Sequence, residues 1–252
     1  MVKYTYIKGA DKMYFQYYIM GIILLPGLIF AMWAQSKVNG AFREYSGVNT
    51  KMGVTAGRVI ERFVRQSGMD YITINKISGH LTDNFNPMNK TINLSQSVYD
   101  SSSIAAIGVA THEFGHALQQ KEHYAPYVLR RIVIPVSNIA SYLLWPLVII
   151  GLVLNVFVYA ESTLIGDIFL WSGIGFFGLS VLLNLITLPV EYNASHRALK
   201  LLEDSGTMDD EELSGAREVL NSAALTYVAA LVVAILNFLR FILVVTRYSR
   251  RR

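Results

Sequence analysis

Residues 103–121 read SIAAIGVATHEFGHALQQK, and this stretch decides how the rest of the chain is interpreted. Outside its polar motif the stretch is apolar and rich in small residues, which predicts a helix from about Ser103 to Lys121. His112 and His116 lie four positions apart within it. Because residues at that spacing project from one face of a helix, we expect the two imidazoles to reach the same point in space.

The motif HEFGH, from His112 to His116, matches the HExxH pattern of zinc-binding helices. Two imidazole nitrogens on one face can bind a single Zn²⁺, and Glu113 can then take a proton from a water molecule that the metal activates. Burying two imidazoles and a carboxylate in an apolar helix without a metal would be unfavourable. The motif therefore predicts one Zn²⁺ per chain at a peptide-hydrolysing site. The alternative is a degenerate helix that binds zinc without catalysis.

A catalytic zinc site needs a third protein ligand, and cysteine is excluded because the chain has none. The pattern HExxHxxGxxH would place that ligand at Glu122, but Gln119 stands where the pattern requires glycine. The stronger candidate is Glu191, because Pro189 is expected to begin a helix and to place Glu191 in its first turn. The alternative is that Glu191 is only a helix-start carboxylate stabilised by the helix dipole.

The composition indicates a membrane protein, since 53% of the 252 residues are hydrophobic and only 16% are charged. Four apolar segments are long enough to cross a bilayer, namely 13–35, 132–158, 168–190 and 223–246, the middle two forming a hairpin. We therefore predict about four transmembrane helices. A cleaved signal peptide is the alternative for the first segment, but Gln35-Ser36-Lys37 is a poor cleavage site.

The net charge of +4 comes from Lys and Arg residues that are scattered or flank the apolar segments. They do not form one basic stripe, so we expect the lipid bilayer as a partner and no nucleic acid. Arg240 lies near the end of the last apolar segment, where its side chain can reach the interface. A membrane transporter is a third class of function, but the apolar segments lack the polar groups that transport sites usually require.

The region 36–131 is mixed in polarity and is expected to face water. An amphipathic pattern from Thr55 to Gln66 predicts a helix, and Tyr71–Ile74 has the alternation of a strand. The segments 79–83 and 90–95 flank the turn-rich 84–89, which predicts a β-hairpin or two linked edge strands. An extended substrate is expected to pair with the edge strand Thr91, Ile92, Asn93, Leu94 and Ser95, and the alternative is an ordinary strand of the domain.

The predicted fold is mainly α with a small β element. Its order is an N-terminal tail at 1–12, a transmembrane helix at 13–35, a catalytic domain at 36–131 and a transmembrane hairpin at 132–190. A third-ligand helix and an amphipathic helix follow at 191–222, then a transmembrane helix and basic tail at 223–252. Within this order, Asp209–Glu212 is expected to begin a helix, because negative charges suit a first helical turn. An acidic metal site is the alternative.

Four segments together resemble a known family. They are HLTDNFNPMNKTINLS from His80, HEFGHALQ from His112, PVEYNASHRAL from Pro189 and AALTYVAAL from Ala223. Over most of its length the chain resembles the neutral zinc membrane metallopeptidases of the YugP type. It is more distantly similar to the heat-shock-induced bacterial membrane proteases and the eukaryotic CAAX-processing metallopeptidases. The resemblance implies a zincin-like (gluzincin) catalytic domain with His112, His116 and Glu191 as zinc ligands and Glu113 as base.

The distant relatives carry Glu-x-x-Ala-Asp at the third ligand, and Ser195 stands here in place of the Asp that would support the first ligand. Asn193 or Ser195 is therefore expected to take that supporting role. His80 could donate a hydrogen bond to the oxyanion, and the alternative is a structural histidine.

These observations predict a zinc-dependent endopeptidase that acts on peptide or protein substrates, including membrane-associated ones. The alternative is a non-catalytic zinc-binding membrane scaffold or regulator, which would have no need of Glu113. We expect a multi-pass protein of the plasma membrane. The basic residues on its two sides nearly balance, and the resemblance favours an active site that faces the cytoplasm.

Overall fold

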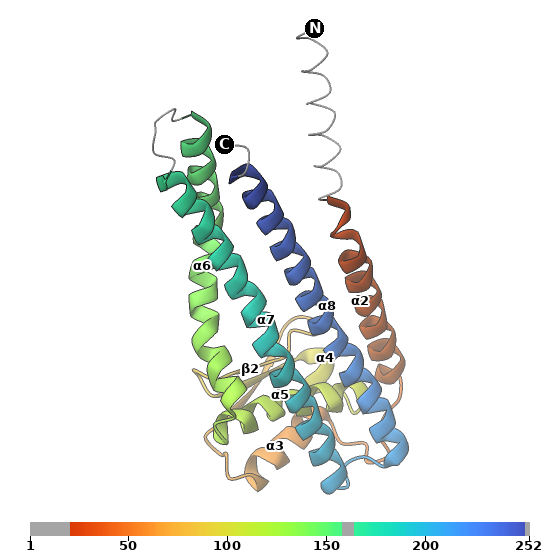
Figure 1. Cartoon of the computed structure of the whole chain (residues 1–252). Helices are drawn as coiled ribbons and strands as arrows, with labels where there is room; N and C mark the ends of the chain where they lie inside the picture. The colour runs from red at the N-terminus through yellow and green to blue at the C-terminus, as the bar shows by residue number, and fades with distance from the viewer. Residues whose placement is uncertain (1–20, 158–163, 250–252) are drawn as a thin grey trace. The chain divides into compact units, whose positions relative to one another are not determined.

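The computed structural model describes residues 21–157 and 164–249, which form long helices and one small sheet (Figure 1). The elements are α2 (Leu25–Ser46), α3 (Ala56–Gln66), β1 (Thr73–Ile77), β2 (Asn84–Asn86), β3 (Thr91–Ser95), α4 (Gln96–Tyr99), α5 (Ile104–Lys121), α6 (Ala125–Phe157), α7 (Leu164–Asp204) and α8 (Asp210–Ser249). The prediction of a mainly α fold with a small β element is confirmed. The start of the predicted first transmembrane helix, before residue 21, lies outside the described residues.

The chain divides into two compact units. One, here named the apolar unit, comprises Met1–Trp33, Ile132–Leu185 and Ala229–Arg252. The other, here named the site unit, comprises Ala34–Arg131 and Ile186–Val228. Helices α2, α6, α7 and α8 each contribute residues to both units.

Glycines let the helices of the apolar unit pack closely. A Cβ added at Gly151 of α6 would lie 3.0 Å from the Leu170 side chain of α7, and one added at Gly27 of α2 would lie 2.7 Å from that of Leu236 in α8. Small residues at such positions allow the close helix approach that is common in membrane proteins. Val148, Leu170 and Val245 form the buried cluster of this unit.

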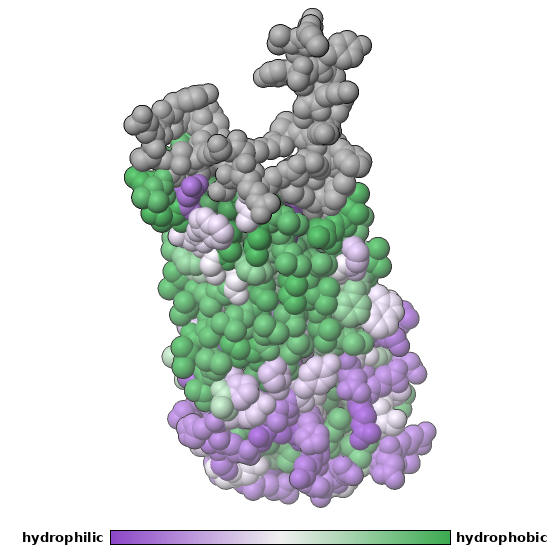
Figure 2. Space-filling model, in the orientation of Figure 1, coloured by the Kyte–Doolittle hydropathy of each residue, from purple (hydrophilic) through white to green (hydrophobic). Residues whose placement is uncertain are grey.

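The surface of the apolar unit is largely hydrophobic in the view of Figure 2. Its exposed large apolar residues include Ile132, Val136, Ile139, Trp145, Ile168, Trp171, Leu182 and Leu185. Among the described residues, three helical stretches are long and apolar enough to cross a membrane: Ala125–Gly151, Leu164–Asp204 and Asp210–Leu243. These stretches contain most of the predicted span at 132–158, all of the span at 168–190 and most of the last span, whereas the span at 13–35 stays a prediction.

The core of the site unit lies where α3, α5 and the sheet meet. The amphipathic helix α3, confirmed at Ala56–Gln66, contributes Val59, Ile60 and Phe63, and β3 contributes Ile92 and Leu94. Phe63 and Phe114 pack ring against ring at 6.0 Å between centroids. Helix α5 begins as predicted, since the Ser103 hydroxyl accepts a hydrogen bond from the Ala106 amide and caps the helix.

The strand order is β1-β3-β2, with β1 parallel and β2 antiparallel to β3. A hairpin is confirmed, because β2 and β3 pair as antiparallel neighbours. The predicted bounds are wrong for its first strand, which is Asn84–Asn86 and lies within the segment 84–89 that was expected to be the turn. The prediction that Thr91–Ser95 is an edge strand is wrong. The earlier strand β1 pairs with its other side, and this central position buries Ile92 and Leu94 completely. The strand β2 lies at an edge instead.

The prediction that Pro189 begins a helix is also wrong, because α7 continues through Pro189 from Leu164 to Asp204. A proline inside a helix removes one backbone hydrogen bond without ending the helix where packing holds both sides. Glu191 therefore lies in a helix interior, and the helix-start alternative for its carboxylate does not apply. The acidic start of α8 is confirmed: Asp209 and Glu212 each accept a hydrogen bond from the other's backbone amide, which is a capping box.

Candidate metal centre

The helices α5 and α7 approach closely at Gly115, between the two histidines of the HEFGH motif. A Cβ at this position would lie 2.6 Å from the carbonyl oxygen of Ala194. Any larger residue would push the backbones apart, so Gly115 sets the distance between the histidine helix and the Glu191 helix. Both segments belong to the site unit.

This approach brings His112, His116 and Glu191 into one cluster. The Glu191 Oε2 atom lies 3.2 Å from Nε2 of His112 and 3.5 Å from Nε2 of His116. Ligands bound to zinc at about 2.0–2.1 Å in a tetrahedron are about 3.3–3.4 Å apart, so these separations suit one zinc ion. The Glu191 side chain is only 2% exposed, and two imidazoles with one carboxylate are typical zinc donors. The residues therefore fit the metal that the HExxH motif predicts.

Each imidazole is held through its second nitrogen. Nδ1 of His112 lies 3.1 Å from the Ser195 hydroxyl, and Nδ1 of His116 lies 3.0 Å from Oε1 of Gln119. Gln119 in turn donates to the Val190 carbonyl and to Asn193 Oδ1, at 2.7 and 2.9 Å. Contacts of this kind fix the orientation of a metal-binding imidazole. Ser195 thus contacts the first histidine, whereas Asn193 reaches the second through Gln119.

Arg130, in the first turns of α6, contacts the carboxylate of Glu191. Its Nη1 donates to Oε1 of Glu191 at 2.8 Å, while Oε2 of the same carboxylate faces the histidines. The two oxygens therefore have separate partners. Sequence reasoning considered Arg130 only as a basic residue beside an apolar segment, and no local pattern links it to position 191. Gln119 was likewise noticed only as a residue in place of a glycine.

The carboxylate of Glu113 is fixed beside the cluster. Its Oε2 atom accepts a hydrogen bond from the Phe85 amide of β2 at 2.9 Å. Burial raises the pKa of Glu113 above its ordinary value, against the opposing effect of the two nearby histidines. Burial alone would lower the pKa of His116, but its hydrogen bond to Glu191 and the nearby Glu113 raise it.

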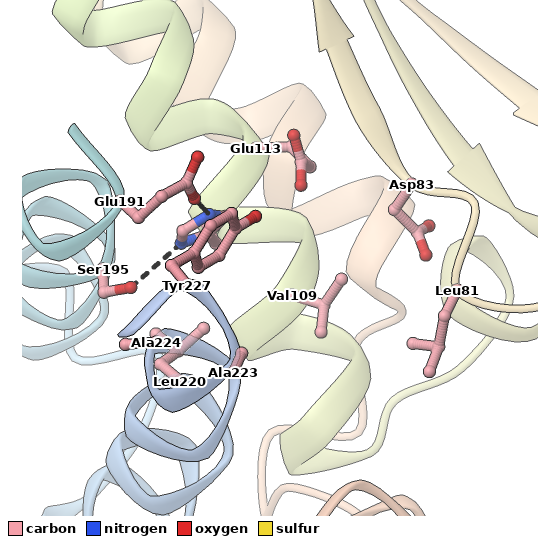
Figure 3. A pocket seen from close by; sticks show the side chains of 11 residues that line it. Leu81, Asp83, Val109, Glu113, Glu191, Ser195, Leu220, Ala223, Ala224 and Tyr227 are labelled. Carbon is pink, nitrogen blue, oxygen red and sulfur yellow. Dashed lines mark hydrogen bonds and ion pairs between the residues drawn. The ribbon is translucent and has the colours of Figure 1, made fainter. Parts of the chain in front are cut away.

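A pocket of about 200 Å³ opens beside the cluster (Figure 3). His112, Glu113, Glu191 and Ser195 line one part of it, and Tyr227 reaches into it from α8. Sequence reasoning missed Tyr227. The only available signal was its place in AALTYVAAL, one of the four segments that resemble the family. That resemblance assigned no role to Tyr227.

Other candidate residues lie elsewhere in the site unit. The Glu122 carboxylate accepts from Arg197 at 2.7 Å and is about half exposed, away from the cluster. The exposed ring of His80 packs edge-on against Phe42, and His80 is not among the residues that line the pocket. The strand from Thr91 to Ser95 is central in the sheet.

Two histidines from an HExxH motif and a distant glutamate, with a further glutamate beside them, are typical of zinc metallopeptidases. Residues 20–246 match a family model described as "Putative neutral zinc metallopeptidase". The chain belongs to this family. It is 39% identical over 222 residues to the "Putative membrane protease YugP" of Bacillus subtilis (strain 168), an alignment that covers 88% of this chain and 94% of that protein. No solved structure is significantly similar to the chain.

Proposed function

We propose that the protein is a membrane-bound endopeptidase that depends on one zinc ion. The observation that supports this most is the buried Glu191 carboxylate beside both histidine Nε2 atoms, with Glu113 lining the same pocket. His112, His116 and Glu191 would hold the ion. Zinc bound there acts as a Lewis acid toward water and toward the peptide carbonyl.

Glu113 is the general base and then the general acid. It takes a proton from the water molecule as the water oxygen bonds to the peptide carbonyl carbon. It then gives that proton to the peptide nitrogen as the C–N bond breaks, which leaves a carboxylic acid and an amine. The hydrogen bond from Phe85 holds one oxygen of Glu113 and directs the carboxylate during both transfers. The raised pKa of Glu113 suits a group that must hold a proton between the two steps.

The substrate main chain pairs with β2 in this proposal. An extended peptide adds to a sheet through an unpaired strand edge, and β2 (Asn84–Asn86) is paired with β3 on one side only. Because the Phe85 amide contacts Glu113, a peptide along this edge would run beside the base. The role expected for the strand Thr91–Ser95 thus falls to its neighbour.

The substitution Glu113→Gln tests the proposed chemistry. The amide keeps the shape of the side chain but cannot accept the proton, so cleavage of denatured casein should fall by at least about 100-fold. Zinc content, measured on the purified protein, should stay at one ion per chain because the ligands are unchanged. Wild-type activity in this variant would rule out the proposed base. Zinc binding without cleavage in the wild type would favour the scaffold alternative.

We also propose that the protein is multi-pass in the plasma membrane with its active site toward the cytoplasm. The relative's name and the three apolar helices support membrane attachment. Since the chain has no cysteine, single cysteines at Ser101 and Ser249 can be labelled in intact cells with an impermeant reagent. Labelling at Ser249 but not at Ser101 is expected. Labelling at Ser101 alone would show that the orientation is opposite to the one proposed.

A further inference from the structure

The pocket beside the cluster has an apolar wall in addition to its polar residues. The residues of that wall are Leu81, Val109, Leu220, Ala223 and Ala224. Figure 3 shows Val109 on α5, Leu220, Ala223 and Ala224 on α8, and Leu81 on the loop before β2. None of these five side chains takes part in the chemistry described above, so the wall calls for an explanation of its own.

The α8 part of the wall has the spacing of one helix face. Leu220, Ala223, Ala224 and Tyr227 are related by steps of three and four residues, which aligns their side chains along one side of the helix. Val109 precedes His112 by three residues on α5 and so shares its side of that helix. The apolar wall is therefore continuous with the catalytic residues on both helices.

Leu81 completes the wall in an unusual conformation. Its φ is 55°, in the left-handed region, and the residue is 38% exposed. A large side chain rarely adopts this backbone conformation, and such strained residues gather at ligand sites. The loop keeps an exposed leucine in the lining of the pocket in spite of this strain.

The size of the pocket limits its occupant. A cavity of about 150 Å³ with apolar walls is enough to hold a benzene molecule, so about 200 Å³ suits one large side chain with part of its main chain. A positively charged occupant would have to share the carboxylate of Asp83 with Ser95. Oδ1 of Asp83 already accepts hydrogen bonds from the Ser95 amide and hydroxyl, at 2.7 and 3.1 Å. An apolar side chain would instead contact the apolar side chains of the wall.

We propose that this pocket is a specificity subsite that binds one large aliphatic or aromatic side chain of the substrate, next to the bond that is cleaved. The inference rests on the proposed peptidase function, because it places a peptide beside Glu113. Burial of a leucine-sized or phenylalanine-sized side chain there increases binding by about 10- to 100-fold over glycine.

The first test measures binding without turnover. The probes are peptide hydroxamates, whose hydroxamate group binds zinc, with glycine, leucine, phenylalanine, aspartate or lysine as the adjacent residue. Leucine and phenylalanine compounds should bind the zinc-loaded protein at least about tenfold more tightly than the glycine compound. Tightest binding of the lysine compound would assign the subsite to Asp83 and overturn the proposal, as would equal binding of all five.

The second test narrows the pocket. Ala223 is partly exposed and lines the pocket, so the larger side chain of Ala223→Leu is expected to extend into it. The matched control is Ala230→Leu, an exposed alanine on the same helix that does not line the pocket. Ala223→Leu should weaken the phenylalanine compound by about tenfold or more and leave the glycine compound and zinc content unchanged. The control should match wild type.

The two proposals fail in different ways. If apolar hydroxamates are preferred but no peptide is cleaved, the pocket binds apolar side chains as proposed, and the peptidase function fails together with the role of the pocket in cleavage. If peptides are cleaved with no apolar preference, or if Ala223→Leu and Ala230→Leu shift selectivity equally, the subsite proposal is wrong and the peptidase function stands.

Discussion

Helix α7 exposes different kinds of residue in its two segments. In the apolar unit its exposed residues include Leu164, Ile165, Ile168, Trp171, Leu182 and Leu185. In the site unit the exposed residues include Tyr192, His196, Lys200 and Glu203, while Val190, Glu191, Ala194 and Ser195 are buried. The first pattern places apolar groups outward, as a helix in lipid requires, and the second places polar groups outward around a buried carboxylate. One uninterrupted helix thus exposes an apolar segment and a polar segment.

The buried carboxylate of Glu191 is tolerated in the site-unit segment of α7 because it has charged and polar partners. Glu191 is neutralised by Arg130 on one oxygen and lies beside two imidazoles on the other. A carboxylate without such partners would be strongly unfavourable in a buried position. The comparison predicts that a change of charge has a different consequence in each segment of α7.

The largest expected effect is at Glu191. Glu191→Ala removes a zinc ligand and leaves Arg130 without its partner, so zinc affinity and casein cleavage should both fall by more than about 100-fold. Equilibrium zinc titration against a metallochromic chelator measures the first quantity. Glu122→Ala is the control, because that carboxylate pairs with Arg197 outside the cluster, and both quantities should stay within a small factor of wild type. The opposite result would move the third ligand to Glu122.

The next effect concerns the apolar segment of the same helix. Leu182→Arg places a charge on an exposed apolar position, which costs about 2.5–3.5 kcal/mol at the centre of a transmembrane helix. The amount of protein that resists alkaline extraction from membranes should therefore fall. Tyr192→Arg, at an exposed position in the other segment, should leave that amount unchanged. Equal losses in both variants would show that the two segments do not face different solvents.

The smallest expected effect is at Arg130. Arg130→Met frees Oε1 of Glu191 without removing a ligand, so zinc affinity should fall by about 10- to 100-fold, as for other residues that hold a ligand. Arg130→Lys keeps the charge and should recover part of the loss. Arg131→Met alters an exposed neighbour and serves as the control. No loss of zinc affinity in Arg130→Met would mean that the ion pair does not position the ligand.

Three short-range patterns in the sequence predicted helices that the structure has. The helix from Ser103 to Lys121, the amphipathic helix near Thr55, and the acidic start of α8 all follow from residues within a few positions of one another. Pro189 gave a wrong prediction, because its local preference favours the start of a helix. The packing of α7 overrides that preference. The sheet order also depends on a distant partner, because only the pairing of β1 with β3 makes β3 central.

The sequence by itself determined the kind of site and two of its anchors, because His112 and His116 share one helical turn and the geometry of a helix fixes their relation. It also indicated the apolar spans, which depend only on composition along the chain. Only the tertiary structure decided that Arg130, Gln119 and Tyr227 join the cluster and that Leu81 completes the apolar wall. Those residues come from four different elements or loops. Their contacts depend on side-chain packing between distant segments, which the spacing of residues along the chain does not predict.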